Sequence, residues 1–263
     1  MTGAEASAVL VRTEAAGGVQ TIILDSPRNA NALSTTLLVQ LRTALEAAMT
    51  AETARLVVLT GAGKVFCAGA DLKEAGSGPA GATVLMAEIM ELLWSARKPV
   101  ICRVNGAARA GGIGLIAASD IAIATDRATF AFSEVRIGVV PAVISVPCLR
   151  RMPSRAAAEY FLTGEVFGAQ RAAEIGLLTR AVPAEELDAE VSRYAGMLLR
   201  GAPGALAGTK GVLRDVPGVS VSAGLQKMAE LSGRYFGSDE AREGMTAFAA
   251  KREPAWVPAA SDD

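Results

Sequence analysis

The sequence predicts an α/β protein in which strand–helix repeats extend to about residue 140 and a helical part follows. Up to that point, short apolar runs of strand length alternate with stretches in which leucines recur at helical spacing. From about residue 142 onward the signals are mostly helical. The chain has 263 residues, of which 51% are apolar and 20% are charged, so it can bury a substantial core.

The first half is expected to open with a hairpin that turns at Ala16-Gly17-Gly18. Ser34 is expected to cap the first helix, and the Gly-, Pro- and Ala-rich stretch 75–82 is typical of a mobile surface loop. The predicted strands are 8–12, 20–24, 55–60, 99–104, 121–124 and 129–132. The predicted helices of this half are 35–50, 83–96 and 111–119. Those of the second half are 142–151, 154–162, 168–175, 184–200, 203–214, 220–235 and 238–250.

Composition excludes several classes of function. The chain has no histidine, so histidine triads, histidine general bases and most zinc sites are ruled out. A net charge of −1 favours neither nucleic acid nor an anionic membrane as a partner. The N-terminal stretch lacks the pattern of a secretion signal, no apolar run is long enough to span a membrane, and three dispersed cysteines fit a reducing compartment. We therefore expect a cytoplasmic protein.

Two segments offer bare backbone to a ligand. In Phe66–Leu72 the residues at 67–70 are all small, which lets a ligand approach main-chain N–H groups, although a tight loop would show the same pattern. In Ala110–Gly114 three glycines open a helix whose first N–H groups lack intrahelical partners and suit a developing oxyanion. Close helix packing is the alternative there. Cys67 is expected to be a packing residue rather than a nucleophile.

The third segment carries one carboxylate. Glu134 follows a predicted strand in the apolar run FSEVRIGVVPA. Desolvation would raise the pKa of its carboxyl group, which suits general acid–base chemistry. An ordinary ion pair with Arg136 is the alternative interpretation.

Taken together, FCAGADLKE, NGAARAGGIGLIAASD and FAFSEVRIGVVPA resemble the enoyl-CoA hydratase/isomerase, or crotonase, superfamily. The resemblance extends from the hairpin to FAAKREPAW near the C-terminus. It implies a spiral of ββα repeats in residues 1–200, which hold the CoA-thioester site. It also implies a helical oligomerisation region in 201–263 and assembly as a homotrimer or as a hexamer of two trimers.

The resemblance also assigns the site. Ala70 and Gly111 would supply the two peptide N–H groups of an oxyanion hole, and Glu134 would be the catalytic acid or base. Other residues would hold the coenzyme A part of the substrate: Arg28, Ala30, Ala68, Asp71, Leu72 and, reaching a neighbouring subunit, Phe248 and Lys251. Solvated charges at Arg28 and Lys251 and a core position for Phe248 are the alternatives. No further cofactor and no metal are expected.

The sequence departs from the family's hydratase pattern at one position. Hydratases of the family use two glutamates, and the first of them falls on Gly114 here. Resemblance favours a hydratase acting on 2-enoyl-CoA. The single carboxylate favours a Δ3-Δ2-enoyl-CoA isomerase, and a catalytically weak CoA-binding scaffold is a third possibility. Acyl-chain length and branching, the pathway, and the choice between trimer and hexamer stay open.

Three further expectations concern residues outside these motifs. Arg109 is expected to pair with an acidic side chain at the subunit interface, or alternatively with a substrate carboxylate or CoA phosphate. Asp120 is expected to tie the start of a strand to nearby amides. The C-terminal helices are expected to bury apolar side chains in a trimer contact: Leu213, Leu225, Met228, Leu231 and Phe236.

Overall fold

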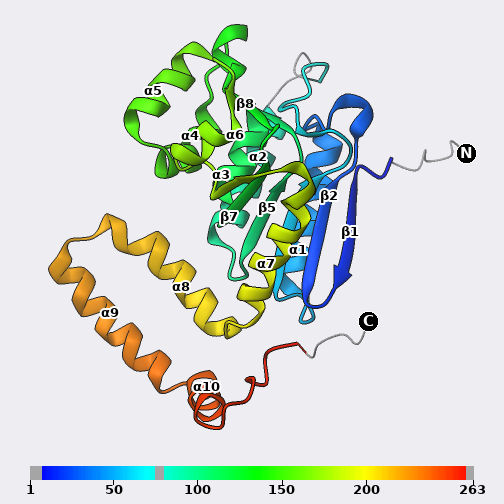
Figure 1. Cartoon of the computed structure of the whole chain (residues 1–263). Coiled ribbons are helices and arrows are strands. Elements are labelled where there is room, and N and C mark those ends of the chain that lie inside the picture. Colours follow the sequence, from blue (N-terminus) through cyan, green and yellow to red (C-terminus); the bar gives the residue numbers. More distant parts are fainter. Residues whose placement is uncertain (1–7, 75–79, 259–263) are drawn as a thin grey trace, which may run out of the picture.

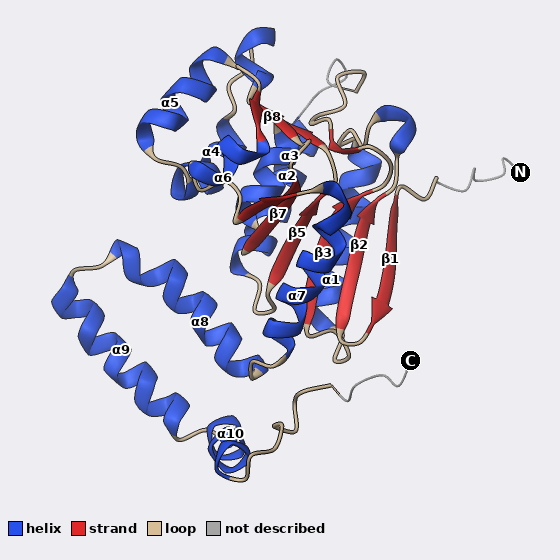
Figure 2. Cartoon of the chain, in the orientation of Figure 1, coloured by secondary structure: helices blue, strands red, loops and turns tan. Residues whose placement is uncertain are grey.

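A computed structural model describes residues 8–74 and 80–258, and two β-sheets form its centre (Figures 1 and 2). The larger sheet has six strands in the order β1-β2-β3-β5-β7-β10, and the smaller has four in the order β4-β6-β8-β9. The larger sheet contains β1 (Val11–Ala16), β2 (Val19–Leu24), β3 (Leu56–Gly61), β5 (Val100–Val104), β7 (Ile121–Thr125) and β10 (Arg180–Val182). The smaller contains β4 (Val65–Cys67), β6 (Ala107–Arg109), β8 (Thr129–Ala131) and β9 (Phe167–Gly168).

The larger sheet is covered on both faces, which explains its near-continuous apolar strands. Alternate residues of β3 point to opposite sides: Leu56 and Val58 pack toward α7, whereas Val57 and Leu59 join the main core with α1 and α2. β1 and β2 form the predicted antiparallel hairpin around Gly17 and Gly18, and the other pairings in this sheet are parallel.

The helices agree closely with the sequence pattern. Ser34 caps the first helix as expected, since its hydroxyl accepts a hydrogen bond from the Leu37 N–H. The first seven helices are α1 (Thr35–Thr50), α2 (Ala80–Ser95), α3 (Gly111–Ala118), α4 (Ala142–Arg151), α5 (Ser154–Thr163), α6 (Ala169–Glu174) and α7 (Leu187–Leu199). The short 3-10 turns are η1 (Pro27–Asn29), η3 (Ser133–Ile137), η4 (Ala184–Glu186) and η5 (Val216–Gly218). The predicted loop at 75–82 is wrong at 80–82, where α2 begins, and 75–79 lie outside the described residues.

Helices α8 (Pro203–Asp215), α9 (Val221–Phe236) and α10 (Asp239–Ala249) extend away from the sheets (Figure 1). Lys210 anchors α8, because its ammonium lies 2.5 Å from Asp120 Oδ2 and also donates to the Lys98 carbonyl. Arg55 donates to the carbonyls of Gly201 and Trp256 and so ties the C-terminal segment to β3. Within the described ranges, none of the helices has both the length and the apolar character needed to cross a membrane.

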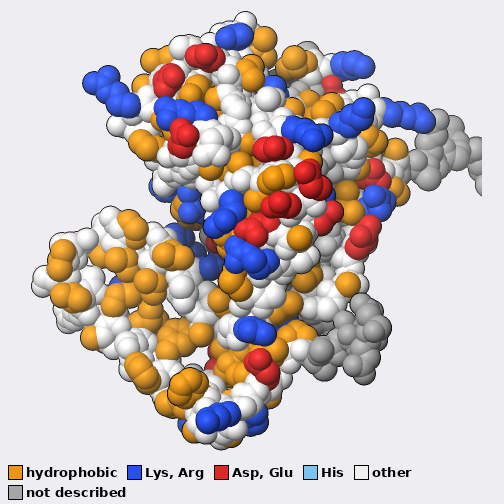
Figure 3. Space-filling view, viewed as in Figure 1, with side chains coloured by type: hydrophobic (Ala, Val, Ile, Leu, Met, Phe, Trp, Pro, Cys, Tyr) orange, Lys and Arg blue, Asp and Glu red, His pale blue; other side chains and the backbone are white. Residues whose placement is uncertain are grey.

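Apolar side chains gather on the surface of these C-terminal helices (Figure 3). Leu213, Leu225 and Phe236 are each about 70% exposed, at 71%, 67% and 71%. Met228 and Leu231 are half-buried. Helices with this much uncovered apolar surface have the character of an assembly surface. The division predicted at residue 200 and the oligomerisation role of the residues after it both stay predictions.

Candidate active site

All three of the predicted catalytic residues line one cavity. The cavity has a volume of about 280 Å³, and Ala70, Gly111 and Glu134 all face it. Its remaining wall is mostly apolar: Leu33, Leu38, Ala82, Met86, Ala110, Val139, Val140, Pro141, Ala142, Val143 and Ile144. The polar residues Thr35, Asp71, Glu74 and Thr83 complete it. The structure thus brings together residues that are 64 positions apart in the chain, from 70 to 134.

The first loop leaves β4 and presents the backbone of Ala70. Leu33 pairs with Ala70 in a parallel bridge, in which the Leu33 N–H donates to the Gly69 carbonyl and the Asp71 N–H donates to the Leu33 carbonyl. This alternation leaves the N–H of Ala70 outside the bridge. Gly69 has a φ of +88°, which a residue with a side chain would adopt only at a cost. The turn therefore places Ala70, whose N–H takes no part in the bridge, in the wall of the cavity.

The second loop is the start of α3. Ala110 precedes it with a φ of +47°, an uncommon conformation for a residue with a Cβ and one that clusters at functional sites. The N–H of Gly111 is at the first position of α3 and has no intrahelical acceptor. A Cβ on Gly111 would lie 2.7 Å from Leu33 Cδ1, and one on Gly69 would lie 2.9 Å from the Ala110 Cβ. The two loops therefore touch at Gly69 and Ala110, and a side chain at position 111 would have to displace Leu33.

Glu134 reaches the cavity from η3. Phe132, which is fully buried, fixes the start of this turn by packing against Phe161 at 4.0 Å and Phe167 at 6.2 Å between ring centroids. Gly138 ends the turn in the left-handed conformation. Within the part of the chain that the structure describes, Glu134 Oε2 is buried without a hydrogen-bond partner. Burial raises the pKa of Glu134, opposed by a hydrogen bond from its own backbone N–H.

The alternative interpretation, an ion pair between Glu134 and Arg136, is wrong. The guanidinium of Arg136 donates instead to the carbonyl of Thr163, at 3.2 Å. A half-buried carboxylate with an unsatisfied oxygen, in a mostly apolar cavity, is costly to maintain. Such a group is suited to taking up and releasing a proton.

The position of the absent second glutamate is occupied by apolar side chains. Gly114 is buried in the middle of α3. A Cβ placed on it would lie 2.8 Å from Ile144 Cγ2 and closer still to Met90 Cε. A glutamate at position 114 is therefore incompatible with the present packing of Met90 and Ile144. Sequence reasoning identified the glycine but missed Met90, because nothing in the α2 pattern marks that methionine as its neighbour.

The predicted CoA residues form one group near the first loop. The Ala68 N–H donates to the Ala30 carbonyl at 3.0 Å, and Arg28 is exposed on the adjacent turn. Asp71 lines the cavity, and Leu72 beside it is 63% exposed. Asn31, which the sequence analysis did not select, holds this arrangement: its fully buried amide donates to the carbonyls of Ala62 and Val65. Its burial and left-handed backbone are visible only in the structure, so the sequence offers no signal for it.

Phe248 and Lys251 are separate from this group. Figure 1 shows α10 at the bottom of the molecule, far from α3 and β8 in its upper part. Phe248 is 87% exposed, so the alternative that it belongs to the core is wrong for the single chain. Lys251 is also exposed, directly after α10. Their predicted contact with a neighbouring subunit stays a prediction.

Three remaining expectations can be compared with the structure. Cys67 is fully buried and burial raises its thiol pKa to about 12, which confirms a packing residue. Asp120 accepts a hydrogen bond from the Val100 N–H at 2.7 Å, as predicted for a residue that ties a strand start. Within its own chain the Arg109 guanidinium donates to the Thr129 carbonyl and hydroxyl, and its predicted contact with a subunit interface or with substrate stays a prediction. Burial lowers the pKa of Arg109.

Comparison with known proteins adds an independent line of evidence. Residues 14–258 match the family model described as enoyl-CoA hydratase/isomerase. The enoyl-CoA hydratase domain-containing protein 3, mitochondrial, of Rattus norvegicus is 31% identical over 97% of this chain and 86% of that relative. The carnitinyl-CoA dehydratase of Proteus mirabilis is 34% identical, over 91% of this chain and 95% of that relative.

Solved structures agree with these relatives. An enoyl-CoA hydratase from Shewanella pealeana superposes with a TM-score of 0.89 at 36% identity, covering 94% of this chain and 96% of that one. A protein from Mycobacterium avium paratuberculosis, described as a possible enoyl-CoA hydratase, is 42% identical over 95% of this chain and all of that one. Its TM-score is lower, at 0.73. The predicted fold class is confirmed by these likenesses.

Proposed function

Because the chain belongs to the enoyl-CoA hydratase/isomerase family, we propose that it processes acyl-CoA thioesters through an enolate held in the cavity described above. The principal reaction proposed is hydration of a 2-enoyl-CoA. The observation that carries the proposal is the arrangement of Ala70, Gly111 and Glu134 around one apolar cavity. Relatives that bear the names of enoyl-CoA hydratases support the choice of reaction.

In this proposal the thioester carbonyl oxygen accepts hydrogen bonds from the N–H groups of Ala70 and Gly111. Addition of water oxygen at Cβ moves the double-bond electrons onto the carbonyl oxygen, and the enolate then takes a proton at Cα. Fixed donors stabilise the charge on that oxygen without reorganising, and losing one such donor costs about 3 kcal/mol of barrier in other enzymes. The start of α3 adds the positive end of its helix dipole.

Glu134 handles the proton. As a carboxylate it removes a proton from water or from Cα, and as a carboxylic acid it returns one. Its raised pKa brings these two forms closer in free energy near neutral pH, which favours both directions of transfer. Hydration that uses Glu134 as its catalytic carboxylate needs a second group to hold the water. Thr35, Asp71, Glu74 and Thr83 are the other residues with polar side chains that line the cavity.

Isomerisation of a 3-enoyl-CoA is the second candidate, and the packing of Gly114 favours it. The reaction takes a proton from C2 and returns it to C4, so a single carboxylate suffices. Met90 and Ile144 fill the space that a second glutamate would need. The same oxyanion donors serve both reactions, which is why the geometry of Ala70 and Gly111 does not separate them.

The remaining parts of the proposal concern binding and assembly. Arg28, Ala30, Ala68, Asp71 and Leu72 would contact the CoA part of the substrate. Phe248 and Lys251 would contact the nucleotide bound by a neighbouring subunit in a trimer or hexamer built on the exposed apolar faces of α8 and α9. A cytoplasmic location and the absence of a nucleic-acid partner belong to the same proposal.

The test is product analysis with crotonyl-CoA, a 3-enoyl-CoA and a branched 2-enoyl-CoA, for the wild type and for Glu134→Gln. Loss of the enoyl absorbance with crotonyl-CoA indicates hydration, and conversion of the 3-enoyl thioester indicates isomerisation. We expect Glu134→Gln to lower kcat by about 10²-fold to 10⁴-fold while the Kd for a CoA thioester stays within about twofold. A fully active Glu134→Gln variant would remove the catalytic assignment.

A further inference from the structure

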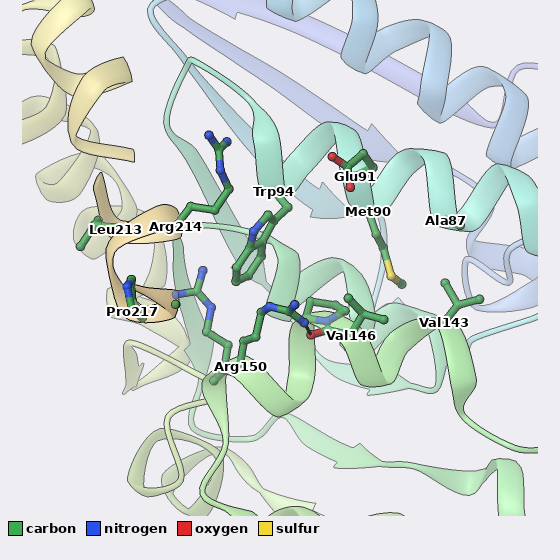
Figure 4. Close-up of a pocket in the computed structure, with 13 residues that line it drawn as sticks. Ala87, Met90, Glu91, Trp94, Val143, Val146, Arg150, Leu213, Arg214 and Pro217 are labelled. Carbon is green, nitrogen blue, oxygen red and sulfur yellow. Dashed lines mark hydrogen bonds between the residues drawn. The ribbon is translucent and has the colours of Figure 1, made fainter. Parts of the chain in front are cut away.

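A second, larger hollow adjoins the proposed active site. It has a volume of about 960 Å³ and lies between α2, α4 and the turn that follows α8 (Figure 4). Met90 and Trp94 reach it from α2, and Arg150 reaches it from the end of α4. Arg151, the last residue of α4, also lines it. Arg214 lines it from α8. None of these residues has a role in the proposed chemistry.

The hollow and the active-site cavity share a partition. Val143 lines both of them. Met90 lines the hollow, and Ile144 lines the active-site cavity. The Met90 methyl group and Ile144 meet beside Gly114. Figure 4 shows the Met90 side chain directed from α2 toward α4, between Val143 and Val146. A flexible, unbranched thioether thus forms part of the wall, and such a side chain changes rotamer readily.

The far side of the hollow is cationic. Three arginines line it, whereas Glu91 is the one carboxylate among its described lining residues. The guanidiniums of Arg150 and Arg151 lie 6.0 and 5.0 Å from the centre of the Trp94 ring. Within the described ranges, neither of these two arginines forms a salt bridge. Arg150 donates a hydrogen bond to the Val146 carbonyl, and Arg151 donates to the carbonyls of Ala117 and Ser119. Arg214 pairs with Asp215.

We propose that this hollow is a distal subsite for the acyl group, which accepts long chains that end in a carboxylate once Met90 moves aside. The inference rests on the proposed function, because the chain must enter from the cavity beside Glu134. The apolar partition suits the methylene part of the chain. The arginines supply the charge-assisted, geometrically suited donors that a terminal carboxylate prefers. The substrate class is therefore an ω-carboxyacyl-CoA.

The kinetic test compares 2-enoyl-CoA thioesters of matched and increasing chain length, with and without a terminal carboxylate. The measured quantity is the ratio of kcat/KM between the two forms at each length. We expect the wild type to prefer the ω-carboxy form by at least about tenfold once the chain is long enough to pass Met90. The double variant Arg150→Gln/Arg214→Gln is expected to bring this ratio close to one.

Two further variants sharpen the test. Arg155→Gln removes an exposed arginine on α5, away from the hollow, and is expected to keep the wild-type ratio. Met90→Ala is expected to raise kcat/KM for long ω-carboxy chains relative to crotonyl-CoA, because it opens the partition. A wild type that turns over crotonyl-CoA without any preference for the carboxylate overturns the inference and leaves the proposed function intact.

Binding provides a readout that does not need turnover. The chain has two tryptophans, so Trp256→Phe leaves Trp94 as the single reporter inside the hollow. A saturated ω-carboxyacyl-CoA is expected to change its fluorescence more than the unsubstituted thioester of equal length does. Equal responses would overturn the inference even if no thioester is turned over. Dissociation of the native assembly in Arg150→Gln/Arg214→Gln, measured by light scattering, would instead identify the hollow as a contact between copies and would also overturn it.

Discussion

The packing around Gly114 yields a prediction whose size follows from the structure. Gly114→Ala adds one methyl group inside α3, at a position where the new Cβ would lie 2.8 Å from Ile144 Cγ2 and closer to Met90 Cε. Both neighbours are buried, at 4% and 5% exposure. Met90 can move its terminal methyl, whereas Ile144 is β-branched and therefore stiff.

Two opposing contributions determine how much Gly114→Ala changes the free energy of unfolding. Alanine in place of glycine inside a helix stabilises by about 1 kcal/mol. Overpacking of a filled core costs roughly 1–3 kcal/mol, so the free energy of unfolding of Gly114→Ala is expected to fall by about 1 kcal/mol. Met90→Ala alone leaves a cavity and is expected to cost roughly 2–4 kcal/mol. In the Met90→Ala background most of the clash is gone, and Gly114→Ala is then expected to be neutral or to stabilise by up to about 1 kcal/mol.

The assay is a double-mutant cycle of Gly114→Ala and Met90→Ala, followed by denaturant unfolding at fixed protein concentration. The two substitutions are expected to couple by about 1–2 kcal/mol, and Gly114→Ala is expected to lower Tm by roughly 2–4 °C. Effects that add to within about 0.5 kcal/mol would show that Met90 does not hold the space beside Gly114. The whole account of the missing carboxylate would then need another explanation.

The same steric argument determines the expected hydratase activity of a Gly114→Glu variant. A missing carboxylate that alone limits hydration would make Gly114→Glu more active. Because Met90 and Ile144 fill the site, we expect the single variant to gain no hydratase activity, and expect any gain only when Met90→Ala is combined with it. A gain in the single variant, in a folded protein, would contradict this packing.

Three shorter predictions concern other residues. Burial raises the pKa of Glu134, so the folded state holds the carboxyl proton more tightly than the unfolded state does. The wild type should therefore lose stability relative to Glu134→Gln as pH rises from the ordinary glutamate range through the raised pKa. Over the same pH interval kcat/KM of the wild type should rise, because the carboxylate form becomes available as a base. Asp120→Asn leaves the Lys210 ammonium, which is 10% exposed, without its charged partner and should lower the free energy of unfolding by roughly 3 kcal/mol. As a control, Asp188→Asn removes the exposed ion pair with Arg103 and should lower it by less than about 1 kcal/mol, both measured by urea unfolding. Iodoacetamide at neutral pH should leave activity unchanged, because the buried Cys67 thiol has a pKa of about 12; alkylation at Cys67 with loss of turnover would contradict this.

The sequence was sufficient for elements whose signal is local. Ser34 marks a helix start by hydrogen-bonding chemistry alone, and the hairpin turn needs only Gly17 and Gly18, both of which have positive φ. The strands that were missed, β4, β6, β9 and β10, have two or three residues each; β8, also of three residues, was predicted. Such segments show no periodicity of their own and become strands only because the neighbouring chain supplies hydrogen-bond partners.

The same distinction between local signals and contacts made only in the fold applies to the candidate site. Ala70, Gly111 and Glu134 were identified because each lies in a motif that resembles a known family, and the structure then brings the three to one cavity. Met90, Ile144 and Asn31 could not be identified, because their roles depend on which side chains meet across elements. Arg109 is a similar case: the sequence shows an unusual charge, but only the fold reveals that its guanidinium donates to Thr129.

Helix α3 connects these observations physically. Its N-terminus offers the Gly111 amide to the cavity, and its middle carries Gly114 at the partition with the second hollow. At its other end the Arg151 guanidinium donates to the carbonyls of Ala117 and Ser119, where a cation is favourable to the helix dipole. Lys210 and Asp120 bring the C-terminal helices to that same end. A short helix held in this way cannot shift at one terminus without disturbing the other, so a substitution at Arg151 should alter kcat as well as the stability of the attached helical region.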